Sequence, residues 1–182
     1  MKSADYCYGE ITPTPPPTPF PTPAGWVSTR IEAVDYTDQV GMEFNPNPVP
    51  HLGLIEDGDY VTYNVNFNPS GTNYRINLLY SLKGSDDRDG GTLEARIGGP
   101  TGLIIGTFLP SPTSESSWDA FIEDTFDLTG EPFVGSQITF VARTERFLMN
   151  FGWFEMGYVE DLNVLTNSPT NQPTNQPTNV SM

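Results

Sequence analysis

The feature that most constrains the fold is a two-residue alternation of apolar and polar side chains in the middle of the chain. Between residues 59 and 67 the apolar positions are every second residue, and residues 74–82 repeat the pattern. Successive side chains of a β-strand point to opposite faces of the sheet, so this period is typical of strands with one buried face. The middle of the chain therefore predicts an all-β domain.

Further strand-like segments are separated by turn-forming sequences rich in Gly, Pro, Asn, Asp and Ser. About eight short strands joined by polar turns are typical of an antiparallel β-sandwich or jelly roll. We expect strands at residues 30–36, 59–67, 74–82, 92–97, 103–109, 118–126, 137–143 and 147–156.

Two Pro-rich tails flank this domain. Residues 12–23 read TPTPPPTPFPTP and residues 168–179 read SPTNQPTNQPTN, both without a charged side chain. Such compositions favour extended spacers and cannot build a packed core. We therefore expect disordered Pro/Thr-rich linkers at residues 1–25 and 161–182, around a domain at residues 26–160.

The charge of the chain argues against two classes of partner. It carries 23 Asp and Glu against 8 Lys and Arg, which gives a formal net charge of −15. So few cations cannot easily form the basic surface that nucleic acid or an anionic membrane requires. The sequence also lacks the long apolar run of about 18 or more residues that a membrane-spanning helix needs. We expect neither nucleic-acid binding nor a membrane span.

A domain between hydroxyl-rich linkers is a common layout in secreted modular proteins. Residues 1–10 lack the apolar stretch of about 7 to 15 residues that a secretory signal contains, so we expect the signal to lie upstream of this sequence. We therefore expect a secreted protein, located outside the cell or in the cell wall. Either linker can lead to a catalytic domain.

Few residues of the predicted domain can carry catalysis. The one histidine, His51, is flanked by Pro50 and Leu52 and is interpreted as a surface loop residue, and the one cysteine, Cys7, lies in the N-terminal tail. We therefore do not expect a catalytic triad, a thiol nucleophile or a structural zinc site. Carboxylates are plentiful, and a glycosidase needs only two of them about 5 to 9.5 Å apart. A jelly-roll glycoside hydrolase is therefore an alternative function.

Five segments together resemble the family 6 carbohydrate-binding modules, which are β-jelly-roll domains of secreted carbohydrate-active proteins. The segments follow one another in the family's order. They are RIEAVDY (30–36), LGLIEDGDYVTYNVNF (52–67), GPTGLIIGTF (99–108), SSWDAFIEDTFDL (116–128) and LMNFGWFEM (148–156). The resemblance implies a galactose-binding-like sandwich that binds a polysaccharide such as β-glucan or xylan and is itself not an enzyme.

The resemblance also implies which residues bind sugar. Trp118 stands at the place of a stacking tryptophan and Asn150 at the place of a sugar-binding asparagine. An aromatic face packs against the C–H groups of a pyranose, and an amide offers its hydroxyl groups both a donor and an acceptor. Glu43, in the loop after the first expected strand, is a further polar candidate.

One departure from the family pattern concerns the second wall of the sugar cleft. Leu54 occupies the position of a second stacking aromatic and offers apolar contact without a π face. The cleft is then one-sided, or His51 or Phe44 supplies the other wall. The strand face that carries Tyr60 is an alternative sugar site. A structural or adhesive wall domain with a decayed sugar site is a third possible function.

A second departure concerns calcium. The resemblance implies a structural calcium ion, for which Glu32 is retained as a ligand. Val34 and Gly152 stand at two other ligand positions and have no side-chain oxygen. Because calcium takes about six to eight oxygen ligands, we expect the site at Glu32 to be degenerate and its calcium binding to be doubtful.

Overall fold

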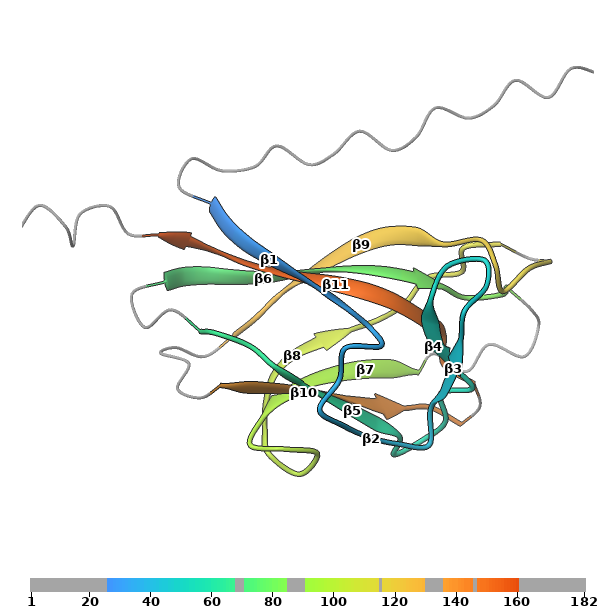
Figure 1. Ribbon diagram of the computed structural model, residues 1–182, viewed down its shortest axis with the longest axis horizontal. Coiled ribbons are helices and arrows are strands. Elements are labelled where there is room, and N and C mark those ends of the chain that lie inside the picture. The colour runs from blue at the N-terminus through green and yellow to red at the C-terminus, as the bar shows by residue number, and fades with distance from the viewer. Residues whose placement is uncertain are drawn as a thin grey trace, which may run out of the picture.

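The computed structural model describes residues 26–67, 71–84, 91–114, 116–129, 136–145 and 147–160 (Figure 1). The tails expected at residues 1–25 and 161–182 lie outside the described residues. Within the described residues all regular structure is β-strand, and no helix there could cross a membrane.

The strands form two layers. Their bounds are β1 Trp26–Glu32, β2 Asp38–Val40, β3 Glu43–Asn45, β4 His51–Gly53, β5 Tyr60–Asn64, β6 Gly71–Ser81, β7 Thr92–Ile97, β8 Leu103–Phe108, β9 Ile122–Asp127, β10 Gln137–Arg143 and β11 Asn150–Glu160. A six-stranded sheet has the order β3-β4-β11-β6-β9, with β1 also paired to β11, and a five-stranded sheet has the order β2-β5-β10-β7-β8. These strand pairs are antiparallel. The predicted antiparallel β-sandwich is confirmed.

The core lies between the two sheets and follows the alternation in the sequence. Tyr63 of β5 contacts Phe140, Phe151 and Phe154 edge-on, with ring centroids 5.0 to 6.3 Å apart, a geometry that aromatic pairs prefer. The alternating apolar residues of the two segments first noticed in the sequence are all buried, namely Val61, Tyr63, Val65 and Phe67, then Tyr74, Ile76, Leu78, Tyr80 and Leu82.

Several predicted strand boundaries are wrong. The first strand was expected at residues 30–36 but spans Trp26–Glu32, because the chain turns after it and the Asp35 N–H donates to the Glu32 carbonyl at 3.0 Å. β9 begins only at Ile122, and β11 runs on to Glu160. The strands β2, β3 and β4 were not predicted, since three residues are too few to show a period.

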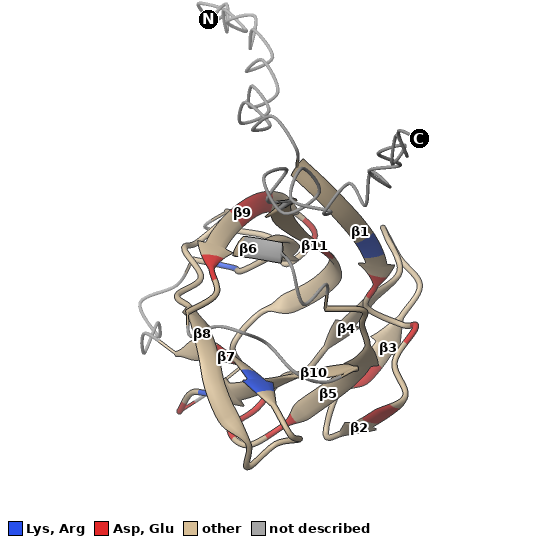
Figure 2. Cartoon of the chain, turned by 90° about the vertical axis from the view of Figure 1, so that its left-hand side faces the viewer, with Lys and Arg blue, Asp and Glu red and all other residues tan. Residues whose placement is uncertain are grey.

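The chain enters and leaves the sandwich at one end. Trp26 of β1 pairs with Val159 near the end of β11, and Glu32 pairs with Trp153. Figure 2 looks at the sandwich from this end, with the six-stranded sheet above the five-stranded one. Asn150, the first residue of β11, therefore lies toward the opposite end, beside the β3–β4 hairpin.

Candidate functional site

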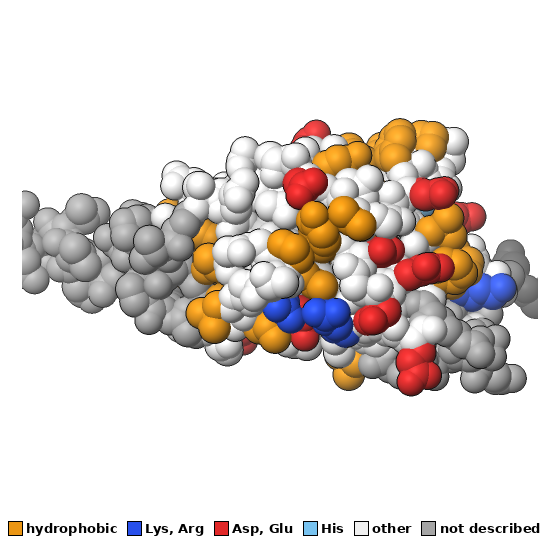
Figure 3. Space-filling view, turned by 90° about the horizontal axis from the view of Figure 1, so that it is seen from below, with side chains coloured by type: hydrophobic (Ala, Val, Ile, Leu, Met, Phe, Trp, Pro, Cys, Tyr) orange, Lys and Arg blue, Asp and Glu red, His pale blue; other side chains and the backbone are white. Residues whose placement is uncertain are grey.

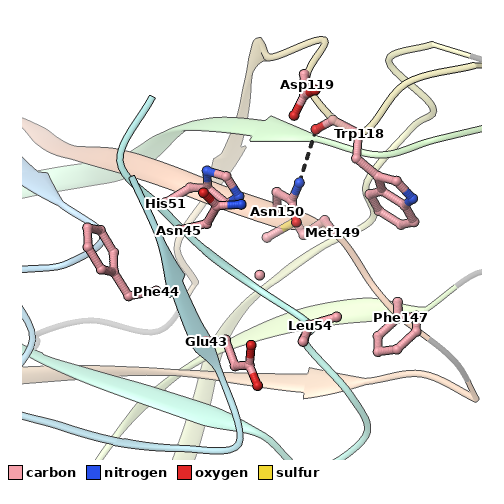
Figure 4. A pocket seen from close by; sticks show the side chains of 11 residues that line it. Glu43, Phe44, Asn45, His51, Leu54, Trp118, Asp119, Phe147, Met149 and Asn150 are labelled. Carbon is pink, nitrogen blue, oxygen red and sulfur yellow. Dashed lines mark hydrogen bonds between the residues drawn. The ribbon is translucent and has the colours of Figure 1, made fainter. Parts of the chain in front are cut away.

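A cleft of about 440 Å³ opens at the end of the sandwich that carries the β3–β4 hairpin. Its volume is within the usual range for small-molecule sites, about 300 to 1,000 Å³. Its walls come from that hairpin, from the loop before β9 and from the segment that leads into β11 (Figure 4). The lining residues are Glu43, Phe44, Asn45, His51, Gly53, Leu54, Trp118, Asp119, Phe147, Met149 and Asn150.

Asn150, at the floor of the cleft, is hydrogen-bonded to the loop that carries Trp118. Its Nδ2 atom donates a hydrogen bond to the backbone carbonyl of Trp118 at 3.0 Å (Figure 4). Since a carbonyl can only accept, this bond fixes the orientation of the amide. The Oδ1 atom lies above Gly53, because a Cβ built on that glycine would be 2.9 Å from it. Asn150 therefore presents an acceptor over the glycine.

Trp118 is anchored through its backbone. Its carbonyl also accepts a hydrogen bond from the hydroxyl of Ser81, a fully buried residue of β6. The neighbouring Asp119 N–H donates to the Ser117 hydroxyl at 3.0 Å. The indole is partly buried against the edge of the core and lines the cleft. The loop before β9 therefore holds this indole in a defined place without burying it completely.

The second wall is apolar and partly aromatic. Leu54, which is 48% exposed, lines the cleft with a φ of 53°, in the left-handed region that non-glycine residues rarely occupy. Phe147, also 48% exposed, lies beside Leu54 in Figure 4. Phe44 lines the rim, and its ring points away from the centre of the cleft in that view. Phe147 was not predicted as a cleft residue, because it was expected to begin the strand at residues 147–156, whereas β11 begins at Asn150.

His51 is not the surface loop residue that was predicted. It begins β4, is only 2% exposed, and its ring packs against Phe121 with centroids 5.3 Å apart. The Nδ1 atom lies 2.8 Å from the Val49 carbonyl. The interpretation failed because a three-residue strand buries a residue that neighbouring prolines suggested was exposed. Buried in this way, the ring does not form an exposed stacking wall.

The cleft end of the molecule is acidic. Glu43 and Asp119 line the cleft, and the described lining contains no Lys or Arg. A second cavity of about 540 Å³ shares Phe147 with the cleft and has Glu56, Asp57, Thr144 and Glu145 as its other lining residues. Figure 3 shows the five-stranded sheet from outside, where most acidic side chains gather toward the right-hand end, at which the cleft opens and where Lys or Arg is also visible. Anionic ligands are therefore disfavoured at this end.

Tyr60 lies outside the cleft, on the outer face of the five-stranded sheet. Its hydroxyl donates to Asp38 Oδ2 at 3.1 Å, and this hydrogen bond raises the pKa of Tyr60. On the same face the Thr62 and Thr139 hydroxyls are hydrogen-bonded to each other at 2.9 Å. The structure thus brings Glu43 together with the other predicted cleft residues, Leu54, Trp118 and Asn150, but separates Tyr60 from them.

The residues around Glu32 do not fit the calcium ion that the resemblance implies. The Glu32 carboxylate accepts a hydrogen bond from Arg30 Nε at 2.9 Å, and the Arg30 guanidinium lies 4.1 Å from the ring centroid of Trp153. Val34 and Gly152 contribute no side-chain oxygen. Across the described ranges, no group of three or more His, Cys, Asp and Glu could hold a metal ion. The Glu32 carboxylate is therefore paired with the Arg30 guanidinium and not surrounded by further metal ligands.

Comparison with known proteins places this fold and cleft in a family. The family described as "Carbohydrate binding module (family 6)" matches residues 32–157. A β-1,3-glucan-binding family 6 module from Bacillus halodurans is 26% identical with a TM-score of 0.56, over 69% of this chain and 92% of that chain. A family 6 module from Clostridium cellulolyticum, solved with xylose, is also 26% identical, with a TM-score of 0.57, over 69% and 94%.

The same fold also occurs inside a larger enzyme. A family 43 arabinoxylan arabinofuranohydrolase from Bacillus subtilis is 20% identical with a TM-score of 0.54, over 72% of this chain and 27% of that chain. The family match covers most of the described sandwich, including the strands and loops that form the cleft. The chain therefore belongs to the family 6 carbohydrate-binding modules, which bind polysaccharide without catalysing its cleavage.

Proposed function

We propose that residues 26–160 bind a neutral β-glucan or xylan in the cleft between Trp118 and Leu54, and that the tails link this module to the rest of a secreted protein. One observation carries the proposal. Trp118 and Asn150 are 32 positions apart in the sequence, yet they meet at one cavity through a 3.0 Å hydrogen bond. Stacking and hydrogen bonding are thereby available to the same sugar.

The chemistry of the lining suits a sugar with free hydroxyl groups. The indole of Trp118 offers an apolar face for the C–H side of a pyranose ring. Asn150 Oδ1 and the carboxylates of Glu43 and Asp119 accept hydrogen bonds, and hydroxyl groups donate them. Uronic acids and sulfated sugars would bring negative charge to a lining that has carboxylates and no described cation. Neutral chains therefore fit best.

The relatives support the choice of glycan and of setting. The two that are 26% identical are described as binding β-1,3-glucan and as a complex with xylose. The arabinofuranohydrolase supports a linked catalytic domain, because there the same fold is one part of a larger hydrolase. Such a module would act outside the cell, where it holds an attached enzyme against its polysaccharide.

The proposal is tested by affinity gel electrophoresis with laminarin, mixed-linkage β-glucan, xylan and polygalacturonate. We expect at least one neutral polysaccharide to retard the parent, and polygalacturonate to have no effect. Trp118→Ala should raise the dissociation constant obtained from the retardation at least about tenfold, since it removes a stacking face and buried apolar area. The matched control is Trp26→Ala. Trp26 lies at the opposite end of the molecule, where its indole covers Gly157.

Two results would contradict the proposal. Equal retardation of the parent and Trp118→Ala would place the glycan elsewhere, and the outer face near Tyr60 would then be the first alternative. A parent that no glycan retards would favour the structural or adhesive wall domain with a decayed sugar site.

A further inference from the structure

We propose that His51 contacts the glycan directly, with its Nε2 atom accepting a hydrogen bond from a sugar hydroxyl beside Asn150 Oδ1. This inference rests on the proposed function, namely that a glycan occupies the cleft. His51 follows a proline and is only 2% exposed, which alone would suggest a purely structural role. The inference gives it a role in recognition as well.

The hydrogen bond at Nδ1 determines what Nε2 can do. Nδ1 lies 2.8 Å from the Val49 carbonyl, and a carbonyl oxygen only accepts. Nδ1 must therefore carry the proton, and in the neutral imidazole the lone pair is then on Nε2. Among the described residues no hydrogen bond reaches Nε2. The ring therefore has an acceptor whose partner has to come from outside the described protein.

The position of Nε2 puts this acceptor at the floor of the cleft. A Cβ built on Gly53 would lie 3.7 Å from His51 Nε2 and 2.9 Å from Asn150 Oδ1. The two acceptors thus flank the same space above a residue that has no side chain, and all three residues line the cleft. A hydroxyl group above Gly53 can donate to one acceptor while a neighbouring hydroxyl donates to the other.

The ring is fixed before any ligand arrives. Its residue is 2% exposed, pairs with Asn45 across the β3–β4 hairpin, and packs against Phe121 with an interplanar angle of 57°. A preorganised acceptor loses little conformational entropy when the ligand binds, so more of the hydrogen-bond energy contributes to affinity. The same rigidity prevents the ring from turning to offer its Nδ1–H instead.

The ligand class follows from this pair of acceptors. A sugar unit over Gly53 must present two neighbouring free hydroxyl groups as donors. An unsubstituted stretch of a neutral chain meets this requirement. A unit whose hydroxyls there are methylated or acetylated has no donors and would leave both acceptors unpaired in a desolvated place, which costs affinity.

The decisive measurement uses the fact that His51 is the chain's only histidine. Nitrogen-15 spectra of the imidazole therefore report this ring alone. In mildly alkaline buffer we expect a protonated Nδ1 and an unprotonated Nε2. Saturation with laminarihexaose, xylohexaose or a mixed-linkage gluco-oligosaccharide, whichever matches the glycan that retards the parent, should shift the Nε2 resonance in the direction of an accepted hydrogen bond and move Nδ1 much less.

Two variants measure the contribution to affinity by calorimetry with the same oligosaccharide. His51→Phe keeps a buried ring against Phe121 but removes both nitrogens, and should weaken binding about tenfold, the usual value of one hydrogen bond. His51→Gln places an amide oxygen near the position of Nε2 and should recover part of that loss. Thermal melting of each variant shows whether it is folded.

The outcomes separate this inference from the proposed function. A parent that binds no oligosaccharide and that no neutral polysaccharide retards contradicts both. A parent that binds with an unmoved Nε2 resonance, or with its proton on Nε2, overturns the role of His51 and leaves the function standing. Equal affinities of the parent and a folded His51→Phe variant have the same meaning.

Discussion

Gly53 controls whether the cleft can offer its acceptors to a ligand. A methyl group there would lie 2.9 Å from Asn150 Oδ1, closer than a comfortable carbon–oxygen contact. The amide would have to move, although its 3.0 Å bond to the Trp118 carbonyl holds it in place. The smallest possible side chain at this position therefore disturbs both recognition and the attachment of the tryptophan loop.

We accordingly expect Gly53→Ala to weaken glycan affinity at least about tenfold by calorimetry, because it displaces one hydrogen-bonding amide and narrows the floor. Gly106→Ala is a matched control. Its new methyl group would meet Phe126 Cε2 at 2.8 Å, a similar clash away from the cleft. The control should lower the melting temperature and leave affinity unchanged. A Gly53→Ala protein with the affinity of the parent would show that the floor does not contact the ligand.

Single residues differed in how well the sequence predicted them. Trp118 and Asn150 were identified through a family resemblance, and they do line one cleft. His51 and Phe147 were missed or misinterpreted, because whether such a residue is buried or lines a cavity depends on loops from three parts of the chain. Local sequence contains no information on which loops will meet.

At the scale of elements, β1 is held to β11 by more than its backbone ladder. Arg30 lies 4.1 Å from the ring centroid of Trp153 and is paired with Glu32 at 2.9 Å, so a cation–π contact and an ion pair share one guanidinium. Both partners of the ion pair are about half exposed, so the pair itself contributes little. The cation–π contact is worth about 0.5 to 1 kcal/mol at such sites.

This arrangement predicts that calcium is not needed for stability. Chelation with EGTA should leave the melting temperature unchanged, because Val34 and Gly152 lack side-chain ligand oxygens and Glu32 is paired with Arg30. Arg30→Ala should destabilise the sandwich by about 1 kcal/mol, seen as a lower midpoint in urea denaturation. A marked fall of the melting temperature in EGTA, restored by added calcium, would contradict this account of the site.

The long strands were predictable and the short ones were not. β7 and β10 have the expected bounds, and β5, β6 and β11 were predicted with ends shifted by up to four residues, whereas β2, β3 and β4 are three residues each and were missed. The first strand was misplaced because its extent is set by its partner. β11 continues to Glu160, and β1 pairs along it from Trp26 to Glu32.

Two buried tyrosines make the stability of the whole molecule decrease at alkaline pH. The Tyr63 hydroxyl donates to the Ala33 carbonyl at 2.7 Å, and the Tyr80 hydroxyl donates to the Ser111 carbonyl at 3.2 Å. Burial raises the pKa of both groups above the ordinary value of 10.0. Their stabilising effect is therefore fully present below about pH 10, the pKa in the unfolded chain, and is lost as pH rises toward the folded-state pKa.

We expect the melting temperature to fall progressively above pH 10. Tyr63→Phe should cost about 1 kcal/mol near neutral pH, since it leaves the Ala33 carbonyl without this partner. The same variant should show a shallower alkaline decline, because it removes one of the groups that must ionise. Identical alkaline profiles for the parent and Tyr63→Phe would refute the assignment.

The pairing of Trp26 with Val159 also determines how the module bears mechanical tension. Tension applied between Trp26 and Val159 acts across one end of the β1–β11 ladder, so its bonds open one at a time from that end. With a glycan held in the cleft, as proposed, tension between that glycan and either of these two residues would run along the strands and load many bonds together. The domain should therefore peel apart readily when stretched between Trp26 and Val159. If it tethers an enzyme to polysaccharide as proposed, it should resist the tension that this attachment creates.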